Sequence, residues 1–192
     1  QESLVTSILR GHRGLLSFGY YLDHLDSAAA HYAIDPLGGP AKNLPPAEAA
    51  RILGGEVCMW TEYVDADTVD SRVWPRSAAV AERLWSPAGV TGVNSMYSRS
   101  DAVSRELDWR GLRHNTNYVP MLQRLAPGHD DLLRILADVV EPLGIDGREG
   151  NHRYNQSTPL NRLVDAARPE SATVREMQLQ IARFNAQDDS AL

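Results

Sequence analysis

The stretch of sequence that decides the fold runs from residue 52 to residue 60 and reads Ile-Leu-Gly-Gly-Glu-Val-Cys-Met-Trp. It is short, mostly apolar and bounded by polar segments, which is typical of a buried β-strand. A similar run at residues 15–22, Leu-Leu-Ser-Phe-Gly-Tyr-Tyr-Leu, predicts a second buried strand. Between the two runs lie a loop rich in Pro and Gly and a short helix at residues 46–51. This order predicts a parallel α/β fold.

An amphipathic helix is expected after the second strand, over residues 71–85. The apolar residues that recur on one side of this helix are Trp74, Ala78, Ala81 and Trp85. The arginines that fall largely off that side are Arg72, Arg76 and Arg83. We expect Asp70 or Ser71 to be the N-cap and Pro75 to lie in or near the first turn.

Beyond residue 86 the sequence predicts a series of helices. They cover residues 96–112, 118–125, 131–140, 160–167 and 171–186, the last with Ser171 as its N-cap. Residues 141–159 are rich in Gly and polar residues and predict a loop or linker. Two parallel strands do not form a stable sheet alone, because such strands are usually buried on both faces. We therefore expect the strand region to need partners outside these 192 residues.

The composition excludes several classes of protein. The chain has 19 Lys and Arg against 25 Asp and Glu, a net charge of −6 with no basic cluster, so nucleic-acid binding is not expected. No apolar run is long enough to cross a membrane. A single cysteine excludes an intrachain disulfide framework. The 6 histidines lack the spacing of metal ligands, so we expect neither a metal site nor a cofactor.

Each predicted strand ends in an aromatic residue and a carboxylate. Tyr21 and Asp23 close the first strand, and Trp60 and Glu62 close the second. Residues i and i+2 of extended backbone point to one face, and the carboxyl ends of parallel strands are where sites form. An aromatic ring stacks on the C–H face of a sugar, while a carboxylate accepts hydrogen bonds from neighbouring hydroxyls. These residues indicate a sugar site; the alternative is that the aromatic rings only pack at the rim of the core.

A long motif carries a resemblance to a known family. Residues 54–65 read Gly-Gly-Glu-Val-Cys-Met-Trp-Thr-Glu-Tyr-Val-Asp, followed by Arg-Val-Trp-Pro-Arg at 72–76 and Ala-Glu-Arg-Leu-Trp-Ser at 81–86. This motif closely resembles the end of the catalytic barrel of family 20 glycoside hydrolases, the β-N-acetylhexosaminidases. Tyr-Leu-Asp at 21–23 resembles the end of that family's seventh strand. The resemblance covers roughly residues 15–125, and residues 158–169 are similar to a helical extension of some bacterial members.

The resemblance implies the C-terminal part of a (β/α)8 TIM barrel. Residues 1–126 would hold its last two strands and helices, and residues 127–192 a helical C-terminal extension. It also implies hydrolysis of terminal non-reducing N-acetylhexosamine from an oligosaccharide or glycoconjugate, by a substrate-assisted retaining mechanism. The family's adjacent Asp-Glu pair, whose Glu is the general acid, is absent from this chain. We therefore expect a fragment that is inactive alone and needs the N-terminal remainder of the enzyme. The family favours a periplasmic or extracellular location.

The resemblance further implies a role for each strand-end residue. Trp60 would form one wall of an aromatic box around the terminal sugar, and Asp23 and Glu62 would bind its outer hydroxyls. Tyr21 would hydrogen-bond the oxygen of the 2-acetamido group, which is the nucleophile, and so aim it at the anomeric carbon. A second hypothesis is a non-catalytic carbohydrate-binding or interaction module that folds through its helical half, residues 96–186.

Overall fold

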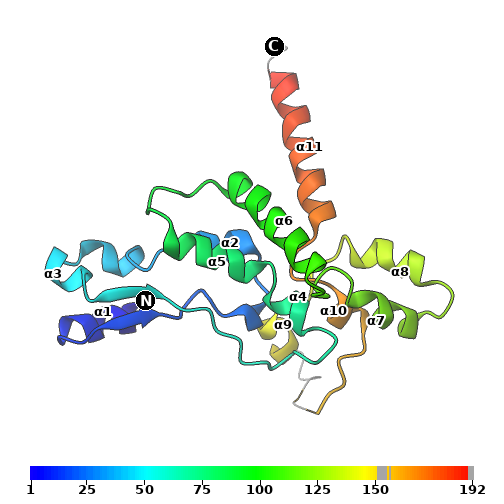
Figure 1. Cartoon of the computed structure of the whole chain (residues 1–192), viewed down its shortest axis with the longest axis horizontal. Helices are drawn as coiled ribbons and strands as arrows, with labels where there is room; N and C mark the ends of the chain where they lie inside the picture. The colour runs from blue at the N-terminus through cyan, green and yellow to red at the C-terminus, as the bar shows by residue number, and fades with distance from the viewer. Residues whose placement is uncertain (151–154, 156, 190–192) are drawn as a thin grey trace.

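The structure, a computed structural model, describes residues 1–150, 155 and 157–189. Its elements follow in the order α1 (Glu2–Leu9), β1 (Gly14–Leu16), 3₁₀ helix η1 (Leu22–His24), α2 (Ala28–Tyr32), 3₁₀ helix η2 (Gly39–Asn43), α3 (Pro46–Ala49), β2 (Ile52–Gly55), α4 (Val69–Val73), α5 (Arg76–Trp85), α6 (Val93–Trp109), α7 (Tyr118–Leu125), α8 (Asp130–Ala137), α9 (Ile145–Gly150), α10 (Leu163–Ala166) and α11 (Ala172–Asp189). Figure 1 shows α1 and α3 at one end of an elongated body and α7 and α8 at the other, with α11 projecting away from it.

The strands β1 and β2 pair in parallel, as the sequence predicts. Gly14 lies opposite Ile52, and Leu16 lies opposite Gly55. Within the described residues this sheet has two strands. The chain is therefore a partial α/β fold in which most of the remaining elements are helices.

Both strands are shorter than predicted, and in the first apolar run the reason is a turn of the backbone. The first strand ends at Leu16, since Gly19 takes a positive φ of 87° and the Tyr20 N–H donates to the Ser17 carbonyl within a turn. The second strand ends at Gly55. An isolated parallel bridge between residues 21 and 58 then continues the alignment toward the ends of both runs.

The single helix predicted over residues 71–85 is wrong: the structure has two helices, α4 and α5. The break falls at Trp74, whose extended backbone has φ −107° and ψ 149°. A residue that precedes proline is disfavoured in helical conformation, and Pro75 follows here. Pro75 thus ends one helix and begins the next.

The buried side of α4 and α5 is also the reverse of the predicted one. Arg72 and Arg76 are each 1% exposed and Arg83 is 8% exposed, whereas Trp85 is 93% exposed. The guanidinium groups can be buried because they donate to backbone carbonyls of neighbouring segments. Arg76 donates to the Leu22 carbonyl of η1 at 3.0 Å, so α5 holds the segment that follows β1. Burial lowers the pKa of Arg76 to about 9.

The later helices follow the prediction except in one segment. The structure has helices α6, α7, α8 and α11 close to the predicted ranges, whereas α10 is only 4 residues long within the range predicted at 160–167. Ser171 Oγ caps α11 by accepting the Val174 N–H at 3.0 Å. The loop predicted at 141–159 is wrong over α9, and its residues 151–154 and 156 lie outside the described residues. Along the described part of the chain, no helix combines the length and apolar character needed to cross a membrane.

The last third of the chain packs back on the first. Glu170 Oε1 accepts the Ala28 N–H at 2.7 Å and the Tyr97 hydroxyl at 2.6 Å, which joins the start of α11 to α2 and α6. The buried residues that form a core among α7, α8 and α10 are Tyr118, Met121, Leu122, Ala137 and Ala166. The contacts of Glu170 therefore attach the C-terminal part of the chain to α2 and α6.

His31 is a buried histidine that the fold holds in its neutral form. Its Nδ1 lies 2.7 Å from the Gly19 carbonyl oxygen, and its Nε2 lies 3.5 Å from an Arg76 guanidinium nitrogen. Burial lowers the pKa of His31 from its ordinary value of 6.5. As the pH falls, the unfolded chain therefore binds this proton before the folded chain does, and the stability contributed by His31 is complete only above about pH 6.5.

We expect the free energy of unfolding to decrease below pH 6.5, with His31 contributing up to about 1.4 kcal/mol per pH unit. His31→Asn, which keeps a donor for the Gly19 carbonyl but cannot be protonated, should flatten this dependence. Urea unfolding at pH 7, 6 and 5 measures it. The control is His129→Asn at an exposed position. Equal slopes for wild type and His31→Asn would contradict the prediction.

Candidate functional site

An open hollow of about 210 Å³ lies at the carboxyl ends of the two apolar runs. It is lined by Tyr21, Asp23, His24, Trp60, Glu62 and Ile145. The structure thus brings together all four residues that the sequence singled out. It also adds His24 and Ile145, which sequence reasoning missed. His24 adjoins Asp23 and could have been noticed, whereas Ile145 lies in the segment predicted as a loop.

Tyr21 is positioned by the bridge that continues the strand pairing. The Leu22 N–H donates to the Cys58 carbonyl at 2.9 Å, immediately after the bridge between Tyr21 and Cys58. The Tyr21 ring stacks on His24, with ring centroids 5.8 Å apart and planes at 23°. The bridge therefore fixes the backbone of Tyr21, and the stacking on His24 supports its ring.

Asp23, which directly follows the first apolar run, is bonded to residues 60 and 61 at the end of the second. It is 4% exposed, and its two carboxylate oxygens accept the Trp60 N–H at 2.7 Å and the Thr61 N–H at 2.8 Å. A carboxylate has about four lone-pair positions, so each oxygen retains one for a further donor. Asp23 thus orders the end of the second apolar run and also lines the hollow. That Asp23 binds the hydroxyl of a ligand stays a prediction.

Trp60 and Glu62 reach the hollow by a route that differs from the predicted one. Extended backbone was expected to place both on one face, but Thr61 between them has a positive φ of 70°. This conformation is uncommon for a β-branched residue, and the hydrogen bond from the Thr61 N–H to Asp23 stabilises it. The convergence of the two side chains therefore depends on a tight local turn.

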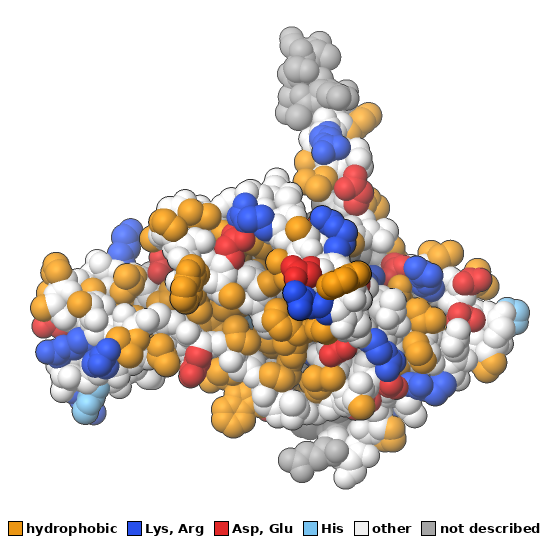
Figure 2. Space-filling view, viewed as in Figure 1, with side chains coloured by type: hydrophobic (Ala, Val, Ile, Leu, Met, Phe, Trp, Pro, Cys, Tyr) orange, Lys and Arg blue, Asp and Glu red, His pale blue; other side chains and the backbone are white. Residues whose placement is uncertain are grey.

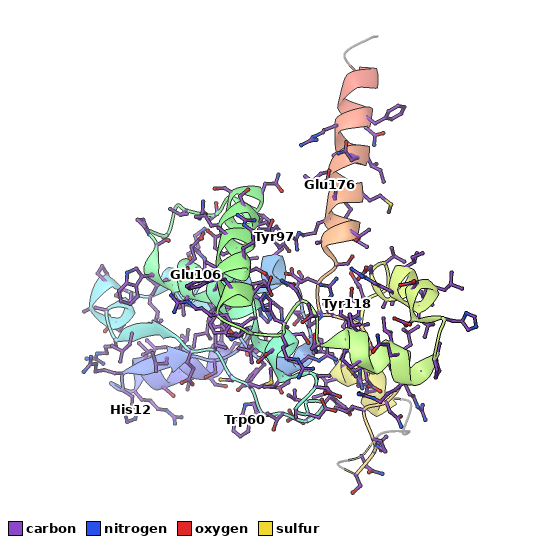
Figure 3. The ribbon with its side chains drawn as sticks, turned by 45° about the vertical axis from the view of Figure 1, so that its right-hand side comes forward. His12, Trp60, Tyr97, Glu106, Tyr118 and Glu176 are labelled. Atoms are coloured by element: carbon purple, nitrogen blue, oxygen red, sulfur yellow. The ribbon has the colours of Figure 1, made fainter. Side chains whose placement is uncertain are left out.

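The Trp60 indole is largely open to solvent. It is 68% exposed, and Figure 3 shows its ring extending away from the ribbon at the edge of the molecule. An exposed indole beside two carboxylates offers a flat apolar surface and charged acceptors within one hollow. This combination suits a ligand that has an apolar face and hydroxyl edges.

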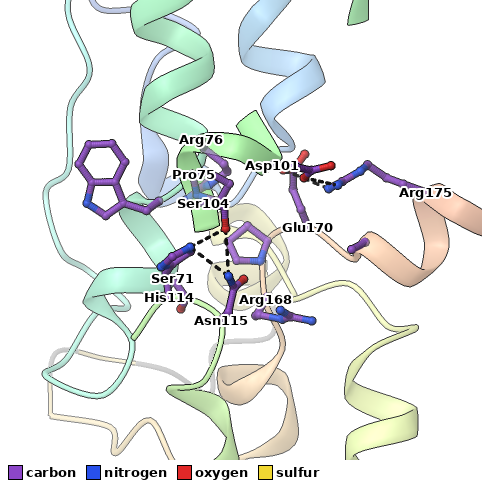
Figure 4. Close-up of a pocket in the computed structure, with 13 residues that line it drawn as sticks. Ser71, Pro75, Arg76, Asp101, Ser104, His114, Asn115, Arg168, Glu170 and Arg175 are labelled. Carbon is purple, nitrogen blue, oxygen red and sulfur yellow. Dashed lines mark hydrogen bonds and ion pairs between the residues drawn. The ribbon is translucent and has the colours of Figure 1, made fainter. Parts of the chain in front are cut away.

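A second cavity, of about 70 Å³, lies at the base of α11 (Figure 4). Here Ser104 Oγ lies 2.7 Å from His114 Nε2, and His114 Nδ1 lies 3.5 Å from an Asp108 oxygen. The order Ser, His, Asp is that of a hydrolytic triad. However, Asn115 Nδ2 donates to Ser104 Oγ at 2.9 Å, and His114 is 1% exposed. This buried network joins α6 to the turn that follows it, so we assign it a structural role.

Metal binding finds no support in the described part of the chain, where no three or more His, Cys, Asp or Glu residues form a suitable group. The carboxylates of the hollow are instead engaged by backbone N–H groups or face solvent.

Comparison with known proteins identifies the region around the hollow. Residues 11–88 match the glycosyl hydrolase family 20 catalytic domain. Residues 11–88 are part of a family 20 glycosyl hydrolase catalytic domain. The matched residues include Tyr21, Asp23, Trp60 and Glu62, so the candidate site lies within the family 20 segment apart from Ile145. The resemblance found in the sequence is confirmed.

Two mammalian proteins are similar to the family 20 segment. β-Hexosaminidase subunit beta of Sus scrofa is 39% identical over 102 residues, 52% of this chain and 18% of that protein. β-Hexosaminidase subunit alpha of Bos taurus is 39% identical over 106 residues, 54% of this chain and 20% of that protein. The chain therefore spans about a fifth of the length of these relatives.

One solved structure resembles nearly the whole chain. The chitobiase of Flavobacterium johnsoniae superposes with a TM-score of 0.88 and 36% sequence identity. The match covers 97% of this chain and 29% of the chitobiase chain. The likeness thus includes the helical part beyond residue 88 as well as the family 20 segment.

Proposed function

We propose that this chain is the sugar-binding end of a β-N-acetylhexosaminidase, an enzyme that removes terminal N-acetylhexosamine from an oligosaccharide or glycoconjugate. The observation that carries the proposal is the convergence of Tyr21, Asp23, Trp60 and Glu62 on one hollow, within the family 20 segment. The names of the similar proteins, two β-hexosaminidase subunits and a chitobiase, support the same activity.

In this proposal each side chain of the hollow has one task. The sugar stacks on the Trp60 indole, and Asp23 and Glu62 accept hydrogen bonds from its outer hydroxyls. The Tyr21 hydroxyl donates to the acetamido oxygen and orients it toward the anomeric carbon. That oxygen attacks and displaces the leaving group, which makes the reaction substrate-assisted.

The rest of the catalytic domain supplies the remaining strands and the general acid. The chain would contribute the last two strands of a (β/α)8 barrel, and this proposal is supported by apolar side chains that the strand region leaves uncovered. Leu15 is 46% exposed, Leu53 51% and Phe18 62%, although parallel strands are usually buried on both faces. Figure 2 shows hydrophobic side chains reaching the surface along the body. The adjacent Asp-Glu pair would lie on one of the completing strands.

The test is hydrolysis of 4-nitrophenyl N-acetyl-β-glucosaminide by the full-length product of the gene that encodes this chain. We expect turnover by that product and none by a polypeptide of these 192 residues alone. An inactive full-length product would contradict the proposed activity. Turnover by the 192 residues alone would contradict the proposed external source of the general acid.

We expect Trp60→Ala in the full-length product to lower kcat/KM by roughly 5- to 150-fold, because lost stacking is worth about 1–3 kcal/mol. Steady-state kinetics on the same substrate measures the change. The matched control is Trp109→Ala on α6, at a position that is 84% exposed and outside the hollow. Equal kcat/KM values for the two variants would contradict the proposed stacking of the sugar on Trp60.

A further inference from the structure

Helix α9 lies against the sugar hollow, although it comes from the part of the chain beyond the family 20 segment. Ile145, its first residue, lines the hollow with Asp23 and Glu62. The approach to η1 is close: a side-chain carbon at Gly144 would come within 3.0 Å of the His24 carbonyl oxygen. Figure 1 shows α9 beside α4 at the centre of the body. One wall of the hollow is therefore formed by α9 and not by the residues at the ends of the two apolar runs.

A buried cation holds α9 in this place. Arg148 is 0% exposed, and its guanidinium donates to Asp165 Oδ1 at 2.6 Å and to the Leu143 carbonyl at 2.8 Å. The guanidinium also lies over the Tyr63 ring, 4.7 Å from its centroid. Because Tyr63 directly follows Glu62 in the chain, this contact joins α9 to the loop that carries a candidate sugar-binding carboxylate.

The partner of that cation is itself fixed to the helix after the second strand. Arg72 of α4 donates to the backbone carbonyl of Asp165 at 2.6 Å and to that of Ala167 at 2.8 Å. Asp165 also accepts the Arg162 N–H through Oδ2 at 2.9 Å. Hydrogen bonds of buried side chains thus connect α4 through Asp165 to Arg148 of α9, and they give α9 a defined position.

We propose that Ile145 contacts the substrate as an apolar wall at the outer-hydroxyl side of the terminal sugar, and that the Arg148–Asp165 pair holds it there. This inference rests on the proposed function. It makes the helical extension part of the binding site, with a role in determining which sugars are accepted.

The chemistry of the contact follows from the side chain and its neighbours. Isoleucine offers no hydrogen bond, so it cannot replace the carboxylates, but it packs against C–H groups and excludes water from one side of the hollow. Hydrogen bonds from hydroxyls to Asp23 and Glu62 are stronger where water is excluded. The same bulk limits the space beyond the outer hydroxyls. Ile145 should therefore disfavour sugars that carry substituents there.

The experiment compares three substrates in the full-length product: the 4-nitrophenyl N-acetyl-β-glucosaminide and its ethers methylated at the 4- or the 6-hydroxyl. Ile145→Ala should reduce discrimination against at least one ether by 3-fold or more in kcat/KM, and should raise KM for the parent sugar with little change in kcat. Ile145→Val, a smaller truncation, should act in the same direction. The matched control is Ile135→Ala on α8, which is 67% exposed and outside the hollow.

The outcomes separate this inference from the proposed function. A wild-type product that does not hydrolyse the parent substrate overturns the proposed function. The ratio of kcat/KM for the parent sugar to kcat/KM for each ether measures the discrimination. If wild type is active and this ratio in Ile145→Ala stays within 3-fold of the wild-type ratio for both ethers, the role of Ile145 is overturned. Arg148→Met should lose discrimination as Ile145→Ala does. Retained discrimination in a folded Arg148→Met variant overturns the anchoring role of the buried pair.

Discussion

Replacing Asp165 by alanine is expected to lower the free energy of unfolding of the full-length product by about 3–5 kcal/mol. The Arg148 and Asp165 side chains are both 0% exposed and lie 2.6 Å apart. Removing one partner leaves the other charge buried without compensation, which costs far more than the loss of an exposed ion pair. The loss should extend to the site, because α9 and the Tyr63 contact depend on the same guanidinium. Urea unfolding and kcat/KM measure the two effects.

Two further variants test the cause of this destabilisation. The double variant Arg148→Met/Asp165→Leu removes both charges and should recover most of the stability, because apolar pairs of similar volume often replace buried ion pairs without loss. Glu106→Gln breaks a pair whose side chains are about 60% exposed, and should cost less than about 1 kcal/mol. A cost below about 1 kcal/mol for Asp165→Ala would contradict the anchoring role of the buried pair.

Asp23→Asn is expected to lower kcat/KM by about 10- to 150-fold, since the proposed charge-assisted hydrogen bond to a sugar hydroxyl is worth about 1.5–3 kcal/mol. The variant also loses the hydrogen bond from the Trp60 or Thr61 N–H. The amide keeps one acceptor oxygen and turns an NH₂ group toward a backbone N–H. The backbone at residues 60 and 61 should therefore be less ordered, and the free energy of unfolding should fall by about 1.5–3 kcal/mol.

A deoxy substrate separates the two roles of Asp23. If Asp23 binds an outer hydroxyl, its removal should matter less for a sugar that lacks that hydroxyl, as in a double-mutant cycle. Glu106→Gln is the matched carboxylate-to-amide control at an exposed position of α6 (Figure 3). An Asp23→Asn variant with the wild-type free energy of unfolding would show that the bonds from the Trp60 and Thr61 N–H groups do not order this part of the backbone. A wild-type value of kcat/KM for Asp23→Asn would contradict the proposed binding of a sugar hydroxyl by Asp23.

The candidate site could be predicted from the sequence because its residues lie at the ends of two apolar runs. Parallel pairing alone brings such ends together, so Tyr21 and Trp60 were expected at the same end of the sheet. The local geometry could not be predicted. The positive φ of Thr61 depends on the Asp23 carboxylate, a contact between residues 38 positions apart. Long-range hydrogen bonds leave no periodic pattern in the sequence.

The buried arginines and α9 were missed for a related reason. Hydrophobic periodicity assigns arginine to the surface, yet Arg72 and Arg76 are buried because backbone carbonyls of distant segments accept from them. In α9, Gly147 and Gly150 lower the intrinsic helix propensity, so the sequence favours a loop. Tertiary contacts of Arg148 supply what local propensity lacks. Sequence patterns therefore predicted most of the helices but not the polar contacts that position the site.

The most direct test of the proposed substrate-assisted chemistry compares two substrates of the full-length product. One is 4-nitrophenyl N-acetyl-β-glucosaminide, and the other is 4-nitrophenyl β-glucoside, which lacks the acetamido group. Because an oriented neighbouring nucleophile is worth many orders of magnitude in rate, we expect kcat/KM for the glucoside to be at least about 10³-fold lower. Comparable kcat/KM values for the two substrates would contradict the proposed role of the acetamido oxygen and of Tyr21 as its donor.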